Sequence, residues 1–301
     1  MNITITGASG FVGQNLSAFL KKKDYDVQDL SLRQENWRSQ ISIDAKAIIH
    51  LAGKAHDTSN TDNPEAYFKV NRDLTTEVFQ VFLQSKIKDF FFFSSVKAVA
   101  DTVERILEED VMARPLTPYG KSKLEAEEYL LKQELPAGKR LFIIRPSMIH
   151  GPGNKGNLNL LYNIVKKGIP WPLAAFHNER SFLSIDNLNF LIQQMLENIN
   201  LESGVYNFTD DEFVSTNQLI EIISSCENKK SRLWKISPKL IGGLAKVGDT
   251  LRLPLNSERL QKLTEDYRVS NTKIKSALGI ESLPLTAEEG LRKTIVSFKN
   301  N

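Results

Sequence analysis

Tyr119 and Lys123 are the pair of side chains in this sequence best suited by type and spacing to do chemistry. They stand four residues apart at the start of a run with helical spacing, so a helix would place both on one face, one turn apart. A free phenol, with a pKa of about 10, is a poor base at neutral pH, but a nearby ammonium stabilises the phenolate and lowers that pKa. A tyrosine tuned in this way can exchange a proton with the hydroxyl of a sugar or steroid. The spacing alone would equally fit an exposed tyrosine and a solvated lysine.

A glycine-rich turn near the start of the chain suggests that this pair acts beside a cofactor. Residues 2–6 predict a short β-strand, a turn with glycines at every third position follows, and residues 14–22 have helical spacing. Such a turn lets the backbone approach a pyrophosphate, and the N–H groups at the start of the helix favour phosphate. We therefore expect a dinucleotide cofactor here, in contact with Gly7, Ser9, Gly10, Phe11, Val12 and Gly13.

The end of the second predicted strand bears on the choice of cofactor. In NAD binders this strand usually ends in an acidic residue that binds the ribose 2′-hydroxyl. The strand predicted at 26–31 ends in Ser31, and Arg33 follows two residues later. A guanidinium suits a 2′-phosphate, so NADP(H) is slightly favoured over NAD(H). The alternative is that Arg33 is an exposed loop residue and that the ribose is held by other groups.

Strands and helices alternate through the first half of the chain, with further strands predicted at 47–51, 88–93 and 141–144. This alternation is the signature of a parallel sheet with right-handed crossovers. The predicted fold class is α/β, a Rossmann-type doubly wound parallel sheet with a smaller C-terminal α/β lobe. We assign residues 1–146, with a contribution from about 180–208, to dinucleotide binding, and 147–301 mainly to the substrate lobe.

Ligands of such a sheet bind at the carboxyl ends of its strands. Leu51, Ala52 and Gly53 follow the third predicted strand, and small residues there let a cofactor pass close to the backbone. Ser94 and Ser95 follow a strand of four phenylalanines, which predicts burial on both faces, and they add two hydroxyls at the same edge.

Two polar residues in apolar surroundings have open roles. His50 lies within the third predicted strand, where a histidine satisfied by core neighbours is favoured over an acid–base group. Asn71 lies in the middle of a helix predicted from 63 to 85. It is either polar surface or a residue that bends the helix and holds a water or a carbonyl.

Composition excludes several classes of protein. The 301 residues are 41% hydrophobic and 25% charged, with 39 basic and 36 acidic residues, and this even balance gives no argument for a nucleic-acid partner. Cys226 is the single cysteine, so an internal disulfide is excluded and no metal site is expected. No apolar run approaches the ~20 residues that span a bilayer, and the first residues lack a signal-peptide pattern. We therefore expect a cytoplasmic protein without a membrane partner.

Taken together, these pieces resemble the extended short-chain dehydrogenase/reductase family, in its NAD(P)-dependent nucleotide-sugar branch. The matching segments keep their order from residue 6 to about 190, and they are 6–13, 50–53, Asn71, 93–95, 119–127, Arg145 with Pro146, 151–153 and 180–182. The segment 33–45 is shorter than is usual in the family, which leaves the adenine contacts undefined.

The resemblance implies roles for individual residues. Ser95, Tyr119 and Lys123 would be the catalytic triad: Ser95 binds the reacting sugar oxygen, Tyr119 is the acid or base, and Lys123 tunes Tyr119 and holds the nicotinamide ribose. Further cofactor contacts would come from Leu51, Ala52, Gly53, Asn71, Ser94, Arg145 and Pro146. The substrate would contact Ser95, Val96, Lys97, Asn157 and Arg180, the last two at the nucleotide diphosphate.

Departures from the family pattern reduce the number of activities that the resemblance allows. Sugar 4,6-dehydratases of this branch carry an Asp-Glu pair where Val96 and Lys97 stand, so we discount a dehydratase. The segments 94–97, 155–157 and 178–181 look most like bacterial polysaccharide-pathway enzymes acting at C4 of UDP-N-acetylhexosamines. The favoured function is a 4-keto-6-deoxy-sugar reductase that takes a UDP-linked substrate, and the alternative is a UDP-sugar 4-epimerase.

A non-enzymatic NADP-binding sensor on the same fold is a third alternative. Such relatives usually lose the tyrosine or the lysine, and here the whole triad is present. Dimers are common in this family through the two long helices, here 64–85 and 119–134, so the resemblance also suggests a homodimer.

Overall fold

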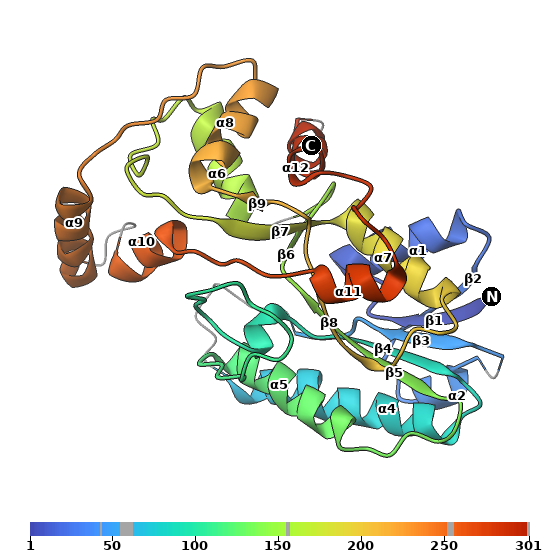
Figure 1. Ribbon diagram of the computed structural model, residues 1–301. Helices are drawn as coiled ribbons and strands as arrows, with labels where there is room; N and C mark the ends of the chain where they lie inside the picture. Colours follow the sequence, from blue (N-terminus) through green and yellow to red (C-terminus); the bar gives the residue numbers. More distant parts are fainter. Residues whose placement is uncertain (43, 55–62, 155–156, 252–255, 300–301) are drawn as a thin grey trace.

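The computed structural model describes residues 1–42, 44–54, 63–154, 157–251 and 256–299. Its centre is a six-stranded parallel sheet with the strand order β2-β1-β3-β4-β5-β8 (Figure 1). The strands are β1 (Asn2–Thr6), β2 (Asp26–Leu30), β3 (Ala47–His50), β4 (Asp89–Phe93), β5 (Arg140–Pro146) and β8 (Gly204–Phe208). The predicted Rossmann-type sheet is confirmed, and its sixth strand comes from beyond residue 200.

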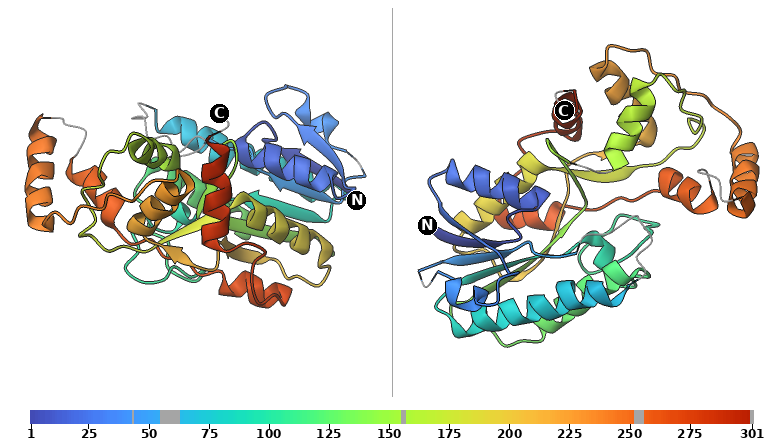
Figure 2. Two further views of the ribbon diagram at one scale, coloured as in Figure 1. Left: turned by 90° about the horizontal axis from the view of Figure 1, so that it is seen from above. Right: turned by 180° about the vertical axis from the view of Figure 1, so that it is seen from behind.

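Helices cover both faces of this sheet (Figure 2). One face packs against α1 (Phe11–Lys21), α7 (Ile185–Glu197) and α11 (Thr272–Leu278), and the other against α4 (Leu74–Gln84) and α5 (Pro118–Leu131). Within β4, Phe91 and Phe93 join the first core and Phe90 and Phe92 join the second, because successive side chains of a strand point to opposite faces. The four phenylalanines are therefore buried on both faces, as the sequence predicted.

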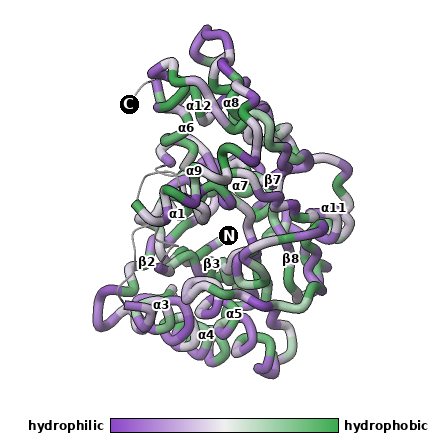
Figure 3. The backbone as a smooth tube through the Cα atoms, turned by 90° about the vertical axis from the view of Figure 1, so that its left-hand side faces the viewer, coloured by the Kyte–Doolittle hydropathy of each residue, from purple (hydrophilic) through white to green (hydrophobic). Residues whose placement is uncertain are grey.

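The polarity of the chain follows this layering (Figure 3), with largely apolar strands inside and helices α4 and α5 alternating between polar and apolar positions. β2 is an edge strand of the sheet, and the short helix α2 (Trp37–Gln40) lies in the connection from β2 to β3. The strand order changes direction where β1 lies between β2 and β3, and ligands of open α/β sheets bind at such a point.

A second lobe lies beside the carboxyl edge of the sheet (Figure 1). It contains a three-stranded sheet with helices packed around a separate apolar core. Its elements are β6 (Met148–His150), β7 (Arg180–Ser184), β9 (Phe213–Val214), α6 (Asn157–Lys166), α8 (Thr216–Cys226), α9 (Pro238–Leu251), α10 (Ser257–Thr264) and α12 (Ala287–Ser297).

The sequence pattern favours a loop at residues 147–156, and β6 corrects this in part. β6 forms because Met148, Ile149 and His150 pair in parallel with Phe182, Leu183 and Ser184 of β7, a partner that no local pattern reveals. Helix α10 is a further element that the sequence pattern did not predict.

The predicted cap of α7 also differs from the one in the structure. From the sequence Asp186 is expected to cap the helix, but Ser184 is the cap, and its Oγ accepts a hydrogen bond of 3.1 Å from Asn187 N. Ser and Asp are both good caps, so composition alone does not separate them. Asp186 lies in the first turn and pairs with Lys293 of α12 at 2.6 Å.

Candidate active site

Ser95, Tyr119 and Lys123 lie together at the carboxyl edge of the sheet. Ser95 is the second residue after the end of β4 and caps the 3₁₀ helix η2 (Val96–Ala98), and its Oγ accepts a hydrogen bond of 3.1 Å from Lys97 N. Tyr119 and Lys123 lie on α5, which begins at Pro118 with Thr117 as its side-chain cap. Tyr119 is hydrogen-bonded to Ser95, and Lys123 Nζ donates to the carbonyl of Phe93 at 2.8 Å. A phenol, an alcohol and an amine from two separate segments therefore share one site.

Burial dominates the electrostatics of this site. It raises the pKa of Tyr119 above its ordinary value, and the hydrogen bond from Ser95 only partly opposes this effect. It lowers the pKa of Lys123 to about 8, with the charge of Glu127 acting in the opposite direction. The sequence led us to expect a lowered tyrosine pKa. That expectation is wrong for this structure, because removal from water raises the pKa of Tyr119 more than the hydrogen bond from Ser95 lowers it.

The space around Lys123 explains why a glycine follows β3. A β-carbon on Gly53 would lie 3.2 Å from Lys123 Nζ and 3.0 Å from Asn71 Oδ1, closer than most side-chain contacts. Gly53 therefore leaves room for the lysine as well as for any ligand at this edge.

Asn71 lies in a π-helical turn, η1 (Lys69–Asp73), between α3 (Glu65–Phe68) and α4. It is fully buried, its Oδ1 accepts from Lys54 N at 2.8 Å, and its Nδ2 donates to Lys54 O at 3.1 Å and to Ser122 Oγ at 3.0 Å. Of the two alternatives, Asn71 is the residue that interrupts the helix and holds a carbonyl. Single π-helical turns frequently mark functional sites.

Ser94 and Arg145 have side chains that are engaged within the protein. Ser94 Oγ donates to Glu127, and Arg145 pairs with Glu127 at 2.6 Å and donates to Glu109 O at 3.2 Å. Pro146 is buried at the end of β5. Sequence reasoning gave Glu127 no role, yet this buried carboxylate joins β4 and β5 to the helix of Tyr119.

His50 is a satisfied core histidine, as favoured from the sequence. Its Nδ1 lies 2.7 Å from Thr6 Oγ1 and its Nε2 lies 3.0 Å from Thr75 Oγ1. Burial lowers the pKa of His50 to about 3, and the charge of Lys123 acts in the same direction. The ring therefore stays neutral at physiological pH.

The glycine-rich turn has the shape of a phosphate cradle. Gly7 has φ of +72°, and a β-carbon there would lie 2.5 Å from Ala52 N, beside Leu51. A β-carbon on Gly13 would lie 2.4 Å from Gly7 O, so both positions need glycine. Helix α1 begins after Gly10 with no side-chain cap and no acidic residue in its first turn, which leaves its N–H groups available to an anion. These features fit a dinucleotide pyrophosphate.

The remaining predicted contacts of this turn are accessible, with Ser9 exposed and Phe11 and Val12 partly exposed. Ser31 and Arg33 follow the end of β2 and are exposed. The last acidic residue of β2, Asp29, accepts hydrogen bonds from Ser17 at 2.8 Å and Lys21 at 2.7 Å, so its carboxylate is engaged toward α1.

Basic groups lie on the side of the site that faces the second lobe. Lys97 Nζ donates to Asp101 O at 2.8 Å and lies 4.0 Å from the centroid of the Tyr267 ring. Burial lowers the pKa of Lys97, and the charge of Arg180 on β7 adds to this effect. Arg180 donates to Lys262 O at 2.7 Å.

The two remaining predicted substrate contacts are Val96 and Asn157. Val96 is buried, whereas Asn157 begins α6 and its side chain lies outside the described part of the chain. Tyr267, whose hydroxyl donates to Ala100 O at 2.7 Å, was missed because no sequence motif surrounds it.

Within the described residues, no cluster of histidine, cysteine, aspartate or glutamate could hold a metal ion. None of the described helices is long and apolar enough to cross a membrane.

Residues 3–208 match the model of the NAD dependent epimerase/dehydratase family. The chain belongs to this family of enzymes. It is 28% identical to a UDP-glucose 4-epimerase of Vibrio cholerae, over 99% of this chain and 95% of that protein. It is 27% identical to the N-acetyl-alpha-D-glucosaminyl-diphospho-ditrans,octacis-undecaprenol 4-epimerase of Escherichia coli O157:H7, over 98% and 94% of the two chains.

Among solved structures, the UDP-N-acetylglucosamine 4-epimerase from Bacillus cereus superposes with a TM-score of 0.78 at 18% identity. The match covers 99% of both chains. The family resemblance seen in the sequence, and the Rossmann-type fold that it implied, are therefore confirmed.

Proposed function

We propose that this protein is an NADP(H)-dependent oxidoreductase that acts at C4 of a UDP-linked sugar, and that it reduces 4-keto-6-deoxy-UDP-N-acetylhexosamines. The observation that carries the proposal is the hydrogen bond between Tyr119 and Ser95 beside the buried Lys123. These groups lie at the same sheet edge as the glycine turn, so a cofactor and a sugar would meet there.

The bound nicotinamide cofactor would supply the hydride for C4. In our proposal Ser95 Oγ donates a hydrogen bond to the C4 oxygen and holds it near Tyr119, which gives its phenolic proton to that oxygen. The raised pKa of Tyr119 suits this direction, because a phenol that stays protonated at neutral pH is ready to act as an acid. Lys123 would bind the nicotinamide ribose and stabilise the phenolate that remains.

The preference for NADP(H) is supported by the end of β2. Ser31 and Arg33 are exposed there, and Asp29 is engaged elsewhere, so no described carboxylate of β2 would repel a 2′-phosphate. The test is a titration of the protein with NADPH and with NADH. We expect tighter binding of NADPH, and Arg33→Ala should remove most of the difference. Tighter binding of NADH by the unaltered protein would reject this preference.

The cations near the second lobe support a diphosphate-linked substrate. Arg180 lies close enough to Lys97 to help lower the pKa of Lys97, and a pair of basic groups suits the two phosphates of UDP. We propose that they, with Asn157, bind the nucleotide diphosphate.

A 4-epimerase is the second candidate, and the two nearly full-length relatives named above favour it. An epimerase would use the same groups, retain its cofactor, and return the hydride to the other face of the 4-keto sugar. Incubation with UDP-N-acetylglucosamine and no added cofactor separates the two. Formation of the C4 epimer would overturn the reductase proposal. Oxidation of NADPH that depends on a UDP-4-keto-6-deoxy-N-acetylhexosamine would support it.

The phenol itself is tested by Tyr119→Phe. Loss of an acid–base group should lower turnover by roughly 10²–10⁴-fold. Tyr129→Phe is a matched control on the same helix, since Tyr129 is also partly buried and its hydroxyl accepts a hydrogen bond of 2.6 Å from Gln80. Unchanged turnover of Tyr119→Phe would remove Tyr119 from the mechanism. An absence of turnover in the unaltered protein, together with NADP(H) binding, would favour a sensor.

A further inference from the structure

The segment 229–248 carries a concentrated positive charge. It contains six basic residues and no aspartate or glutamate, which leaves 33 basic and 36 acidic residues in the rest of the chain. The six are Lys229, Lys230, Arg232, Lys235, Lys239 and Lys246. In the part of the chain that the structure describes, no carboxylate forms an ion pair with any of them. A protein that is otherwise slightly acidic thus concentrates positive charge in one segment of its chain.

Helix α9 adds an exposed apolar stripe to this charge. Four residues with helical spacing face solvent, and they are Leu240 (59% exposed), Leu244 (52%), Val247 (51%) and Leu251 (64%). The adjacent stripe of Ile241, Ala245 and Gly248 is buried, and it packs in one core with Leu260 of α10. The inward side of α9 is therefore already satisfied, and its outward stripe is a second apolar face. Figure 1 shows α9 at the outer end of the second lobe, far from the N-terminal sheet.

Trp234 extends this surface along the segment that leads into α9. Its side chain is 56% exposed, whereas the neighbouring Leu233 turns toward the core of the lobe. The backbone here is held in place, because Trp171 N donates to Arg232 O at 2.8 Å and Trp234 N donates to Trp171 O at 2.9 Å. These backbone hydrogen bonds therefore hold the segment in a position that leaves the indole exposed. Tryptophan is favoured at membrane–water boundaries, where one end of the ring is apolar and the other wet.

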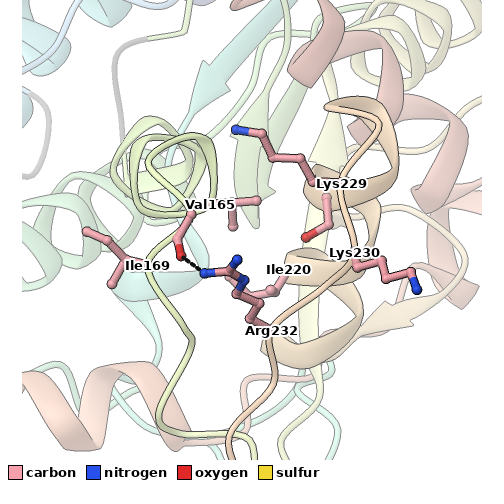
Figure 4. A pocket seen from close by; sticks show the side chains of 8 residues that line it. Val165, Ile169, Ile220, Lys229, Lys230 and Arg232 are labelled. Carbon is pink, nitrogen blue, oxygen red and sulfur yellow. Dashed lines mark hydrogen bonds between the residues drawn. The ribbon is translucent and has the colours of Figure 1, made fainter.

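A hollow of about 300 Å³ lies at the start of the same segment, between α6 and α8 (Figure 4). Lys229, Lys230 and Arg232 border it, and Val165 and Ile220 form apolar parts of its wall. Arg232 Nη1 donates to Gly168 O at 3.0 Å, which holds the guanidinium over the hollow. Arg232 thus brings a cation to a partly apolar hollow, a combination that suits a phosphate headgroup with its acyl chains.

We propose that the outer stripe of α9, Trp234 and the six basic residues form a surface that docks on an anionic lipid membrane. A helix with leucines on one face and lysines beside them lies in the plane of a membrane, with the lysine heads extended toward the phosphates. Lys239 and Lys246 each precede a stripe residue and so lie on one flank of the stripe. A second copy of the chain is a poorer partner, because a twofold contact would set the six cations of each chain against those of the other.

The protein contains its own reporter for this contact. Trp37 and Trp171 are buried, each 4% exposed, so the fluorescence change on docking comes from Trp234. Phosphatidylglycerol vesicles should shift the emission to shorter wavelength and protect it from a soluble quencher, and vesicles of phosphatidylcholine should do so far less. The same two vesicle types are used in co-sedimentation with the full chain. High salt should weaken the binding to the anionic vesicles.

Two variant pairs test the apolar and the charged parts separately. Leu244→Glu with Val247→Glu should abolish co-sedimentation, and Lys239→Gln with Lys246→Gln should weaken it by roughly ten- to thirtyfold. Ile199→Glu is the control, since Ile199 is an apolar residue that is 81% exposed elsewhere on the molecule and should leave binding unchanged. Circular dichroism and NADPH binding verify that each variant is folded.

Several outcomes overturn the proposal. They are equal binding to neutral and anionic vesicles, no binding to either, and vesicle binding that the variants do not change. A fourth is a light-scattering mass that falls from dimer to monomer in the Leu244→Glu variant while vesicle binding is absent, which would assign the stripe to a second copy.

Discussion

The side-chain amide of Asn71 donates a hydrogen bond of 3.0 Å to Ser122 Oγ, and this bond joins the π-helical turn to the helix that carries Tyr119 and Lys123. Ser122 Oγ in turn donates to the backbone carbonyl of Tyr119 at 2.8 Å. The Asn71 amide also holds the backbone of Lys54, directly after Gly53, because its Oδ1 accepts from Lys54 N and its Nδ2 donates to Lys54 O. One buried amide therefore links the segment after β3 to the start of α5.

Asn71→Ala should remove this link. It leaves buried hydrogen-bonding groups of Lys54 and Ser122 without their partner, so unfolding should require about 1–3 kcal/mol less free energy. Turnover should also fall at least several-fold, because α5 loses a contact that fixes Tyr119. Urea denaturation and steady-state kinetics measure the two effects. Asn189→Ala, at a buried asparagine of α7, is the control. If both variants lose stability and neither loses turnover, Asn71 is structural only.

Gly53→Ala should act on Lys123 with little effect on the rest of the fold. The new β-carbon would lie 3.2 Å from Lys123 Nζ and 3.0 Å from Asn71 Oδ1, so one of the two side chains must move. We expect a reduced kcat and a melting temperature close to that of the unaltered protein. Gly243→Ala introduces the same methyl group into open space on α9 and should leave kcat unchanged. Equal activity of the two variants would contradict the steric argument.

Glu127→Gln should strongly destabilise the protein. Arg145 would keep its charge in a buried position, with its side chain only 7% exposed, and lose its carboxylate partner. Breaking such a pair from one side costs about 3–5 kcal/mol. The double variant Glu127→Gln with Arg145→Met should recover part of this loss in thermal or urea unfolding. Glu288→Gln breaks an exposed pair with Arg292 and should change stability little. A small effect of Glu127→Gln would show that the buried pair is dispensable.

His50 should contribute to acid unfolding. Burial lowers its pKa to about 3 in the folded protein, from an ordinary value of 6.5 that the unfolded chain retains. Between these two values the unfolded chain binds the proton and the folded chain does not. The free energy of unfolding should therefore fall as pH falls from 6.5 to 3, by up to about 1.4 kcal/mol per pH unit.

The measurement is urea unfolding across that pH range. His50→Gln should flatten the slope of stability against pH, whereas His177→Gln, at an exposed histidine, should keep it. An unchanged slope in His50→Gln would assign acid unfolding to other groups.

Local patterns in the sequence determined the elements of the sheet and the glycine turn. Strand and helix periods, the four phenylalanines of β4 and the glycine spacing all act within a few residues of chain, so they can be read without knowing the fold.

Contacts between distant segments decided the rest. The hydrogen bond of Tyr119 with Ser95, the close approach of Lys123 to Gly53, and the pairing of β6 with β7 each join residues that no local pattern connects. The direction of the Tyr119 pKa followed from burial, which depends on what surrounds the ring and not on its neighbours in the chain. Helix α9 has two apolar stripes in its sequence, and only its packing against α10 decided which stripe is buried and which faces outward.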